Sequence, residues 1–421
     1  MAMALVVGIA WPLAAQMDHG GHGAAAPPQP PTADPHAGHE MPTPAQPSMA
    51  DHAAMGHGML MPEPAGWRDP ERPISPPPPL MGTQMGSVQT LGVPPLGYEM
   101  DGEVKVFTLI AQPIERSLTS GNPPDESIID ELARFTGHHM GHYFEKRVRI
   151  WGYNGSSPGP TIECTEGDRI RVVLRNELPE PTSIHWHGLE VPREMDGSGG
   201  TTEAPTMPGE TRVYEFTLYQ SGTYLYHSGF NMMKQDGNGL AGFVVIHPRA
   251  PARPLDRDFA VMLQEWAFEP GNPYQNLVTM DFNWFTMGGR AAPDIEVLQV
   301  EQGQRVRIRF GNISMDSHPI HVHGYTWWQV GTEGGPIPDS AQWPGNTIDV
   351  PPGGTRDVEF VAWNPGVWRL HCHKLHHIIN AHAAVPMGLM AHGGMFTLVH
   401  VPPRDPSAPW RHPSETGEAM R

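Results

Sequence analysis

The sequence has few cysteines, few basic residues and no long apolar run. Its only two cysteines are Cys164 and Cys372 among 421 residues, which excludes a framework of several disulfides. Lys and Arg total 27 against 45 Asp and Glu, and the resulting net charge of −18 argues against nucleic-acid binding and is compatible with attracting cations. No segment is apolar and long enough to cross a bilayer, so no membrane span is expected.

The N-terminus has the pattern of a secretory signal. Residues 3–15 are apolar, too short to span a membrane, and end in small residues. The basic segment that usually precedes such a stretch is missing, because the first Lys or Arg of the chain is Arg68. We interpret residues 1–16 as a signal peptide and expect a periplasmic or secreted protein.

The segment that follows is rich in His, Met, Pro and Gly and has no apolar periodicity. We therefore expect residues 17–100 to be disordered. Clusters such as Asp18-His19-Gly20-Gly21-His22 contain side chains that bind copper well. Two interpretations stay open, a copper-acquiring arm and a solvated linker without a specific role.

After residue 100, short β-type runs alternate with Gly, Pro and Asn turns, which predicts an all-β sandwich or barrel. The chain repeats itself at an offset of 136 residues, where residues 167–176 match residues 303–312, and then at an offset of 144, where residues 208–212 match residues 352–356. The repeat predicts two copies of one β domain at 101–248 and 257–401, with a linker at 249–256 and a polar tail at 402–421.

Histidines flank the second cysteine in the triplet His371-Cys372-His373. Because side chains alternate along a strand, Cys372 and the two imidazoles are expected on opposite faces. The thiolate can then bind one metal while the imidazoles bind another, with a short covalent path between the two. His318 and His377 complete a His2Cys set, which with a soft axial ligand describes a blue copper site. The alternative is a buried thiol among surface histidines.

Metal-ligand segments also fall at equivalent places in the two copies. They are His185-Trp186-His187, His227-Ser228-Gly229, His318 to His323, and His371-Cys372-His373. A closed zinc site is less consistent with one thiolate and so many imidazoles.

With these motifs, residues 145–400 resemble the multicopper oxidases, especially the bacterial laccase-like and copper-tolerance members. The resemblance implies two cupredoxin-like Greek-key domains and up to four coppers per chain, of types 1, 2 and 3. It implies a type 1 set of His318, Cys372 and His377, a type 2 pair of His185 and His321, and two type 3 sets, of which one is His187, His227 and His373 and the other His323 and His371. For the axial type 1 ligand, Met387 is favoured over His382 and Met390.

Two further positions matter for the resemblance. The family's second motif ends in histidine where this chain has Gly229, so one type 3 copper lacks a ligand unless Asn231, Met232, Met233 or Asp236 replaces it. Asp196 matches an acid that relays protons in the family, and as part of an Asp-Gly pair it is also a candidate turn former.

The resemblance implies a copper-dependent oxidase that couples one-electron oxidation of Cu(I) or a phenol to reduction of O2 to water. Electrons are expected to enter near the surface through His318 or His377. Two-domain members form homotrimers whose copper clusters lie between subunits, and we expect the same here. The alternatives are a copper-sequestering or copper-resistance protein with impaired oxidase activity and, more weakly, a copper nitrite reductase, in which the cysteine belongs to the first domain; Ser228 stands there in this chain.

Overall fold

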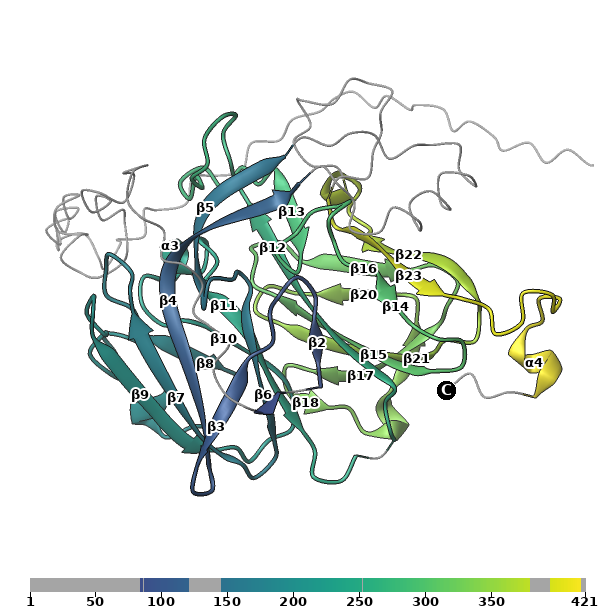
Figure 1. Cartoon of the computed structure of the whole chain (residues 1–421), viewed down its shortest axis with the longest axis horizontal. Coiled ribbons are helices and arrows are strands. Elements are labelled where there is room, and N and C mark those ends of the chain that lie inside the picture. Colours follow the sequence, from purple (N-terminus) through teal and green to yellow (C-terminus); the bar gives the residue numbers. More distant parts are fainter. Residues whose placement is uncertain (1–83, 86, 121–144, 252, 379–393, 418–421) are drawn as a thin grey trace, which may run out of the picture. The chain divides into compact units, whose positions relative to one another are not determined.

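The computed structural model describes residues 84–85, 87–120, 145–251, 253–378 and 394–417. These residues fold mainly into strands that form four sheets (Figure 1). The strands arise where apolar and polar residues alternate; in β7 (Arg169–Asn176), for example, every second side chain is buried. The predicted all-β fold is confirmed. The predicted signal peptide and most of the His/Met-rich segment lie outside the described residues.

The first sandwich consists of two facing sheets. One has the order β1-β3-β4-β7-β9 with β5 paired to β4, and the other has the order β6-β11-β10-β8. Its strands are β1 (Gln84–Met85), β3 (Gly97–Asp101), β4 (Val104–Thr119), β5 (Lys146–Tyr153), β6 (Gly159–Thr165), β7, β8 (Ile184–His187), β9 (Thr211–Thr217), β10 (Gly222–Ser228) and β11 (Ala241–His247). Their inward side chains form a core that includes Trp151, Trp186 and Tyr226.

The second sandwich has the same design. One sheet has the order β13-β12-β15-β21-β17-β18, with β19 on β17 and β2 on β12, and the other has the order β14-β23-β22-β16-β20. Its strands are β2 (Gln89–Thr90), β12 (Arg257–Trp266), β13 (Trp284–Met287), β14 (Leu298–Gln299), β15 (Arg305–Asn312), β16 (His318–Val322), β17 (Trp327–Thr332), β18 (Gly335–Pro336), β19 (Trp343–Gly345), β20 (Thr347–Val350), β21 (Thr355–Val361), β22 (Gly366–Cys372) and β23 (Phe396–Val401). Cys372 is part of its core.

The internal repeat is visible in the strands themselves. β15 begins and ends 136 residues after β7, and β21 and β22 lie 144 residues after β9 and β10. The pairing is also repeated, since β7 pairs with β9 as β15 pairs with β21, and β10 pairs with β8 as β22 pairs with β16. The two copies therefore place their histidine motifs on equivalent strands.

The prediction that residues 17–100 are disordered is wrong at the C-terminal end of this segment. Residues 84–100 contribute β1, β2 and most of β3, and the side chains of Leu91 and Leu96 are buried. These apolar residues are spaced too widely to give a strand periodicity, so the sequence pattern missed them.

Helical segments are short in the described part of the chain. They are η1 (Arg193–Met195), α3 (Met232–Gln235), η2 (Asp339–Ala341), η3 (Leu375–Ile378) and α4 (Pro413–Thr416). None of the described helices has the length and apolar character that a membrane span requires. Two of them, α3 and η3, follow the histidine-bearing strands β10 and β22 and so adjoin the candidate ligands.

A buried arginine joins the two sandwiches. Arg309 of β15 makes two hydrogen bonds to Asp258 at 2.7 and 2.8 Å and donates to Thr223 of β10 at 2.6 Å. Its side chain is 1% exposed, and the carboxylates of Asp258 and Asp357 offset the loss of hydration. This arrangement ties β10, which carries His227, to the second sandwich.

Candidate metal centres

The side chains of β22 alternate as the sequence predicts. Cys372 is buried in the core of the second sandwich, whereas His371 is half-buried and His373 is exposed. The neighbouring strand β16 pairs His321 with His371 and Ile320 with Cys372. The thiol therefore faces one set of ligands and the flanking imidazoles face another.

The first set, which we call the cysteine group, consists of His318, Cys372 and His377. Cys372 Sγ lies 3.6 Å from His377 Nδ1 and 3.9 Å from His318 Nδ1, and the two Nδ1 atoms are 3.0 Å apart. Bonds from a first-row metal such as zinc to imidazole nitrogen and thiolate sulfur are about 2.0–2.3 Å long, so donors to one ion lie roughly 3–4 Å apart. The cysteine group fits a single metal ion.

Burial makes the metal-free cysteine group uncharged. It lowers the pKa of His318 and of His377 to about 3, and in His318 the neighbouring His377 adds to the effect. Burial also raises the pKa of Cys372 to about 12. A bound cation must therefore displace the thiol proton, while both imidazoles are already deprotonated and free to bind it.

The surroundings hold both imidazoles in place. The ring of Phe285 stacks on His377 at 4.1 Å, and Ser314 Oγ lies 2.7 Å from His318 Nε2. Electrons are expected to enter near the surface through His318 or His377. Neither imidazole is exposed to solvent, however, so a donor cannot touch either ring directly in the described structure. The sequence could not show this, because β12, β13 and η3 enclose the group only after folding. The axial candidates Met387, His382 and Met390 lie outside the described residues.

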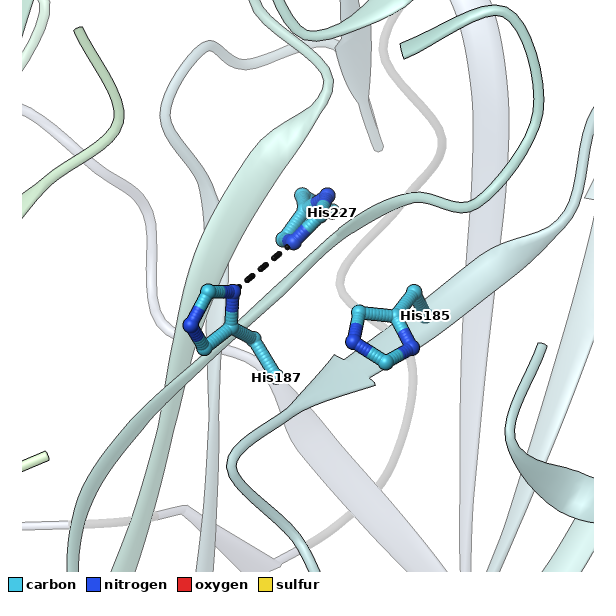
Figure 2. Close-up of side chains that lie close together, drawn as sticks. All are labelled: His185, His187 and His227. Carbon is cyan, nitrogen blue, oxygen red and sulfur yellow. Dashed lines mark hydrogen bonds between the residues drawn. The ribbon is translucent and has the colours of Figure 1, made fainter. Parts of the chain in front are cut away.

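The second set, the first imidazole group, consists of His185, His187 and His227, and Figure 2 shows its three rings close together. His185 and His187 lie on one face of β8, and β10 pairs His227 with His185. His187 Nδ1 is 3.1 Å from His227 Nε2, and the His185 ring centroid is 5.3 Å from that of His227. Burial, followed by the charges of its neighbours, lowers the pKa of His187 to about 4.

Hydrogen bonds behind two of these rings fix which nitrogen points into the group. His185 Nδ1 lies 2.9 Å from the carbonyl oxygen of Asp196 and 3.5 Å from its carboxylate. His227 Nδ1 lies 3.0 Å from Asp236 Oδ2; burial alone would lower the pKa of His227, but this carboxylate raises it. With Nδ1 engaged, Nε2 of each ring is free for a metal. Sequence reasoning considered Asp236 only as a substitute ligand, whereas it lies behind His227.

Gly229 occupies the place where the family pattern has a histidine, and the fold leaves no room there for a side chain. A Cβ atom at this position would lie 1.9 Å from the carbonyl oxygen of Gly197 and 2.8 Å from Ser183 Oγ. Among the proposed substitutes, Asn231 donates to Glu180, and Met232 and Met233 are about half exposed.

The third set, the second imidazole group, consists of His321, His323 and His371, with His373 beside them. His323 Nε2 and His371 Nε2 are 3.2 Å apart, and the His373 ring lies 5.5 Å from that of His321. Burial and the neighbouring imidazoles lower the pKa of His323 to about 4. The ring of His321 is oriented through Nδ1, which lies 2.9 Å from the carbonyl oxygen of Asn346.

The two imidazole groups remain separate within one chain. In the described residues, no ring contact or ligand cluster joins a member of one group to a member of the other. The structure thus brings together the residues predicted for each half of a copper cluster. It does not bring together the predicted pairs across the halves, such as His185 with His321.

Comparisons with known proteins identify the relatives of this chain. Two family models, both described as multicopper oxidase, match residues 139–251 and 268–386. Copper resistance protein A of Escherichia coli is 42% identical over 125 residues, which cover 30% of this chain and 20% of that protein. Laccase-1 of Emericella nidulans is 35% identical over 161 residues, covering 36% and 25%. The matched part thus spans about a fifth to a quarter of these curated relatives.

Solved structures share the fold. Blue copper oxidase from Nitrosomonas europaea has a TM-score of 0.59 at 24% identity, covering 70% of this chain and 85% of that one. Copper nitrite reductase from the same organism has a TM-score of 0.54 at 20% identity, covering 72% and 96%. The family models, the repeated β sandwiches and the imidazole and thiol donors, which suit copper, lead to one conclusion: the chain belongs to the multicopper oxidase family, a family of copper-dependent oxidoreductases.

Proposed function

We propose that this protein is a copper-dependent oxidase that couples four one-electron oxidations of a donor to the reduction of O2, with four protons, to two molecules of water. The single observation that carries the proposal is the position of Cys372 between His371 and His373. The thiol faces the cysteine group, and both imidazoles face the second imidazole group. Copper, when bound, supplies the redox chemistry.

The chain's own residues hold the donors and connect them. Buried His318 and His377 keep neutral imidazoles facing the thiol, and the surrounding core excludes water from the cysteine group. The backbone from Cys372 to its two neighbours is the shortest covalent path between the cysteine group and the second imidazole group. In this proposal, Met387, which lies outside the described residues, would complete the donor set of the cysteine group.

Proton supply is assigned to Asp196. Its carboxylate is 3.5 Å from His185 Nδ1 and accepts a hydrogen bond from Ser198 Oγ at 2.5 Å. Its side chain is 32% exposed, so it can exchange protons with solvent beside the first imidazole group. The same contacts of Asp196 would also stabilise a turn. The proton-relay role is therefore part of the proposal.

We assign the copper cluster to the interface between subunits of a homotrimer. The two imidazole groups are separate in one chain, and together they supply seven imidazoles, which are His185, His187, His227, His321, His323, His371 and His373. The first imidazole group of one subunit then meets the second imidazole group of the next. The shortfall of one imidazole lies at Gly229.

For the donor we propose Cu(I) or a phenol, and for the location the periplasm or the exterior of the cell. Support comes from the relatives named copper resistance protein A and laccase. A second candidate function, copper sequestration without turnover, is favoured by the closed backbone at Gly229, which leaves one cluster position short of a ligand. The nitrite reductase alternative has less support, because Ser228 hydrogen-bonds to Phe230 and Gln235 where a first-domain cysteine would be required.

The test compares copper-loaded wild-type protein with Cys372→Ser. We expect the wild type to show a thiolate-to-copper charge-transfer band, to bind more than two coppers per chain and to consume O2 with a reductant. Cys372→Ser should lose the band and about one copper per chain, together with O2 consumption. Cys164→Ser, which removes the other buried thiol, is the matched control and should keep all three properties.

One or two coppers per chain with a blue band but no O2 consumption would favour sequestration. A wild-type protein that loads with copper and never shows the band would refute the type 1 assignment.

A further inference from the structure

Glu265, a buried acidic residue, lies directly behind the cysteine group. It is located near the end of β12 and is 6% exposed. Its Oε2 accepts a hydrogen bond from the backbone N–H of Asp316 at 3.3 Å, but its Oε1 is buried without a hydrogen-bond partner in the described structure. A buried carboxyl oxygen normally has a hydrogen-bond partner, so an oxygen without one requires an explanation. The groups that surround Oε1 provide it.

Oε1 faces the outer nitrogens of both imidazoles of the cysteine group. It lies 3.5 Å from His318 Nε2 and 4.0 Å from His377 Nε2. Ser314 Oγ also lies behind His318, at 2.7 Å from Nε2, and the half-exposed Asp316 carboxylate lies 3.7 Å from His377 Nε2. His377 Nε2 is likewise buried without a hydrogen-bond partner in the described structure. The inner nitrogens, both Nδ1, face Cys372 Sγ. One carboxyl group therefore lies on the side of both rings opposite the thiol.

We propose that Glu265 is a positioning residue for the type 1 copper, which, together with Ser314 behind His318, keeps the protons of both imidazoles on Nε2 and presents both Nδ1 atoms to the metal. A neutral imidazole carries one proton, and the partner of one nitrogen determines whether the other is free to bind. Carboxylates behind metal-bound histidines act in this way and strengthen the ligands. This inference rests on the proposed assignment of the cysteine group as the type 1 site.

When it is ionised, Glu265 has a second effect. A negative charge a few ångströms from both ligands stabilises cupric copper more than cuprous copper, since the cupric ion carries the larger positive charge. Glu265 should therefore lower the reduction potential of the site. A merely structural role, in which Glu265 only anchors the backbone of Asp316, would not affect the potential.

Two substitutions separate these roles in copper-loaded protein. Glu265→Gln keeps the size and an acceptor oxygen but removes the charge, and Glu265→Leu removes both. We expect Glu265→Leu to weaken type 1 copper binding by roughly 10–100-fold, measured by competition with a chelator while the charge-transfer band is followed. Because burial raises the pKa of Glu265 to about 7, the redox titration is made well above that pH. Both variants should then have a midpoint potential above that of the wild type.

Glu163→Gln is the matched control, because Glu163 is also a shielded carboxylate that bonds to a histidine, His247 at 2.8 Å, but lies outside the ligand groups. It should leave the band and the potential unchanged. Wild-type potentials in both Glu265 variants would overturn the inference, and if Glu265→Leu fails to fold, an unchanged potential in Glu265→Gln does so alone. A wild-type protein without the band would instead show that the proposed function is wrong.

Discussion

At the scale of single residues, the backbone around Gly229 occupies the space that a side chain at this position would need. The N–H of Gly229 donates to Ser183 O at 3.1 Å, and its carbonyl accepts from Gly199 N–H at 3.0 Å. Because the carbonyl of Gly197 lies where a Cβ atom would be, the backbone itself would have to move to admit any side chain.

We therefore predict that Gly229→Ala destabilises the protein by about 1–3 kcal/mol, the usual effect of forcing an extra group into a packed site. The urea midpoint of the metal-free protein measures this change. Gly334→Ala is the control, because the nearest atom to its added Cβ would be Thr332 Oγ1 at an ordinary 3.5 Å. Gly229→His should be no more stable than Gly229→Ala and should bind no additional copper; an additional copper would contradict this account.

The clustering of the candidate ligands could be predicted residue by residue, because alternation on a strand and the repeated motifs place Cys372 and the histidines on known faces. The residues behind the ligands could not. Glu265 belongs to β12, far from β16 and η3 in the sequence, and approaches His318 and His377 only when the sheets pack. Asp236 was noticed for its proximity to Gly229, but its position behind His227 depends on the turn through α3.

At the scale of elements, Glu163 fastens the segment that leads into β2. Located on β6, it accepts hydrogen bonds from the backbone N–H groups of Ser87 and Val88 at 2.8 and 2.9 Å and lies 2.8 Å from His247 Nε2. β2 then pairs with β12 of the second sandwich. One carboxylate thus connects a strand of the first sandwich to a segment that enters the second.

This contact should make stability depend on acid pH. Burial alone would raise the pKa of Glu163, but the bonds from His247, Val88 and Ser87 lower it to about 2, against 4.5 for a free carboxyl. The stabilisation, up to about 3 kcal/mol, is then fully present above pH 4.5 and is lost as the pH falls toward 2. We expect Glu163→Gln to lower the urea midpoint of the metal-free protein at pH 7, and the difference from wild type to shrink between pH 4.5 and 2. A difference that does not vary with pH would rule out this linkage.

The repeat explains why the repeated strands were more predictable than the N-terminal strands β1 to β3. Matching residues fixed the bounds of β7 and β15, and of β10 and β22, at constant offsets. β1 to β3 have no such counterpart in the sequence pattern, and two of them are only two residues long. They form strands because they pair with neighbouring strands of the sheets, and this pairing cannot be read from a single sequence.

At the scale of the whole molecule, the separation of the two imidazole groups determines how many chains make one cluster. If the cluster lies between subunits, a variant defective in the first imidazole group can still supply an intact second imidazole group to its neighbour. A variant defective in the second imidazole group can likewise supply an intact first imidazole group. A cyclic assembly repeats the same head-to-tail contact at every interface.

We predict that His187→Ala and His373→Ala each abolish O2 consumption, and that the two variants co-expressed in equal amounts recover it. Random mixing in a head-to-tail ring leaves about a quarter of the interfaces with both groups intact. Mixing the purified variants without subunit exchange is the control and should give no recovery. If co-expression gives none either, the cluster belongs to a single chain.

The enclosure of His318 and His377 has a consequence for how donors are chosen. Since neither ring meets solvent in the described structure, an electron from outside must tunnel through at least one layer of protein. The rate of electron tunnelling depends on the distance from donor to metal and on the driving force, and only weakly on the molecular shape of the donor. Selectivity would then follow redox potential, and chemically unrelated reductants of similar strength should be used at similar rates.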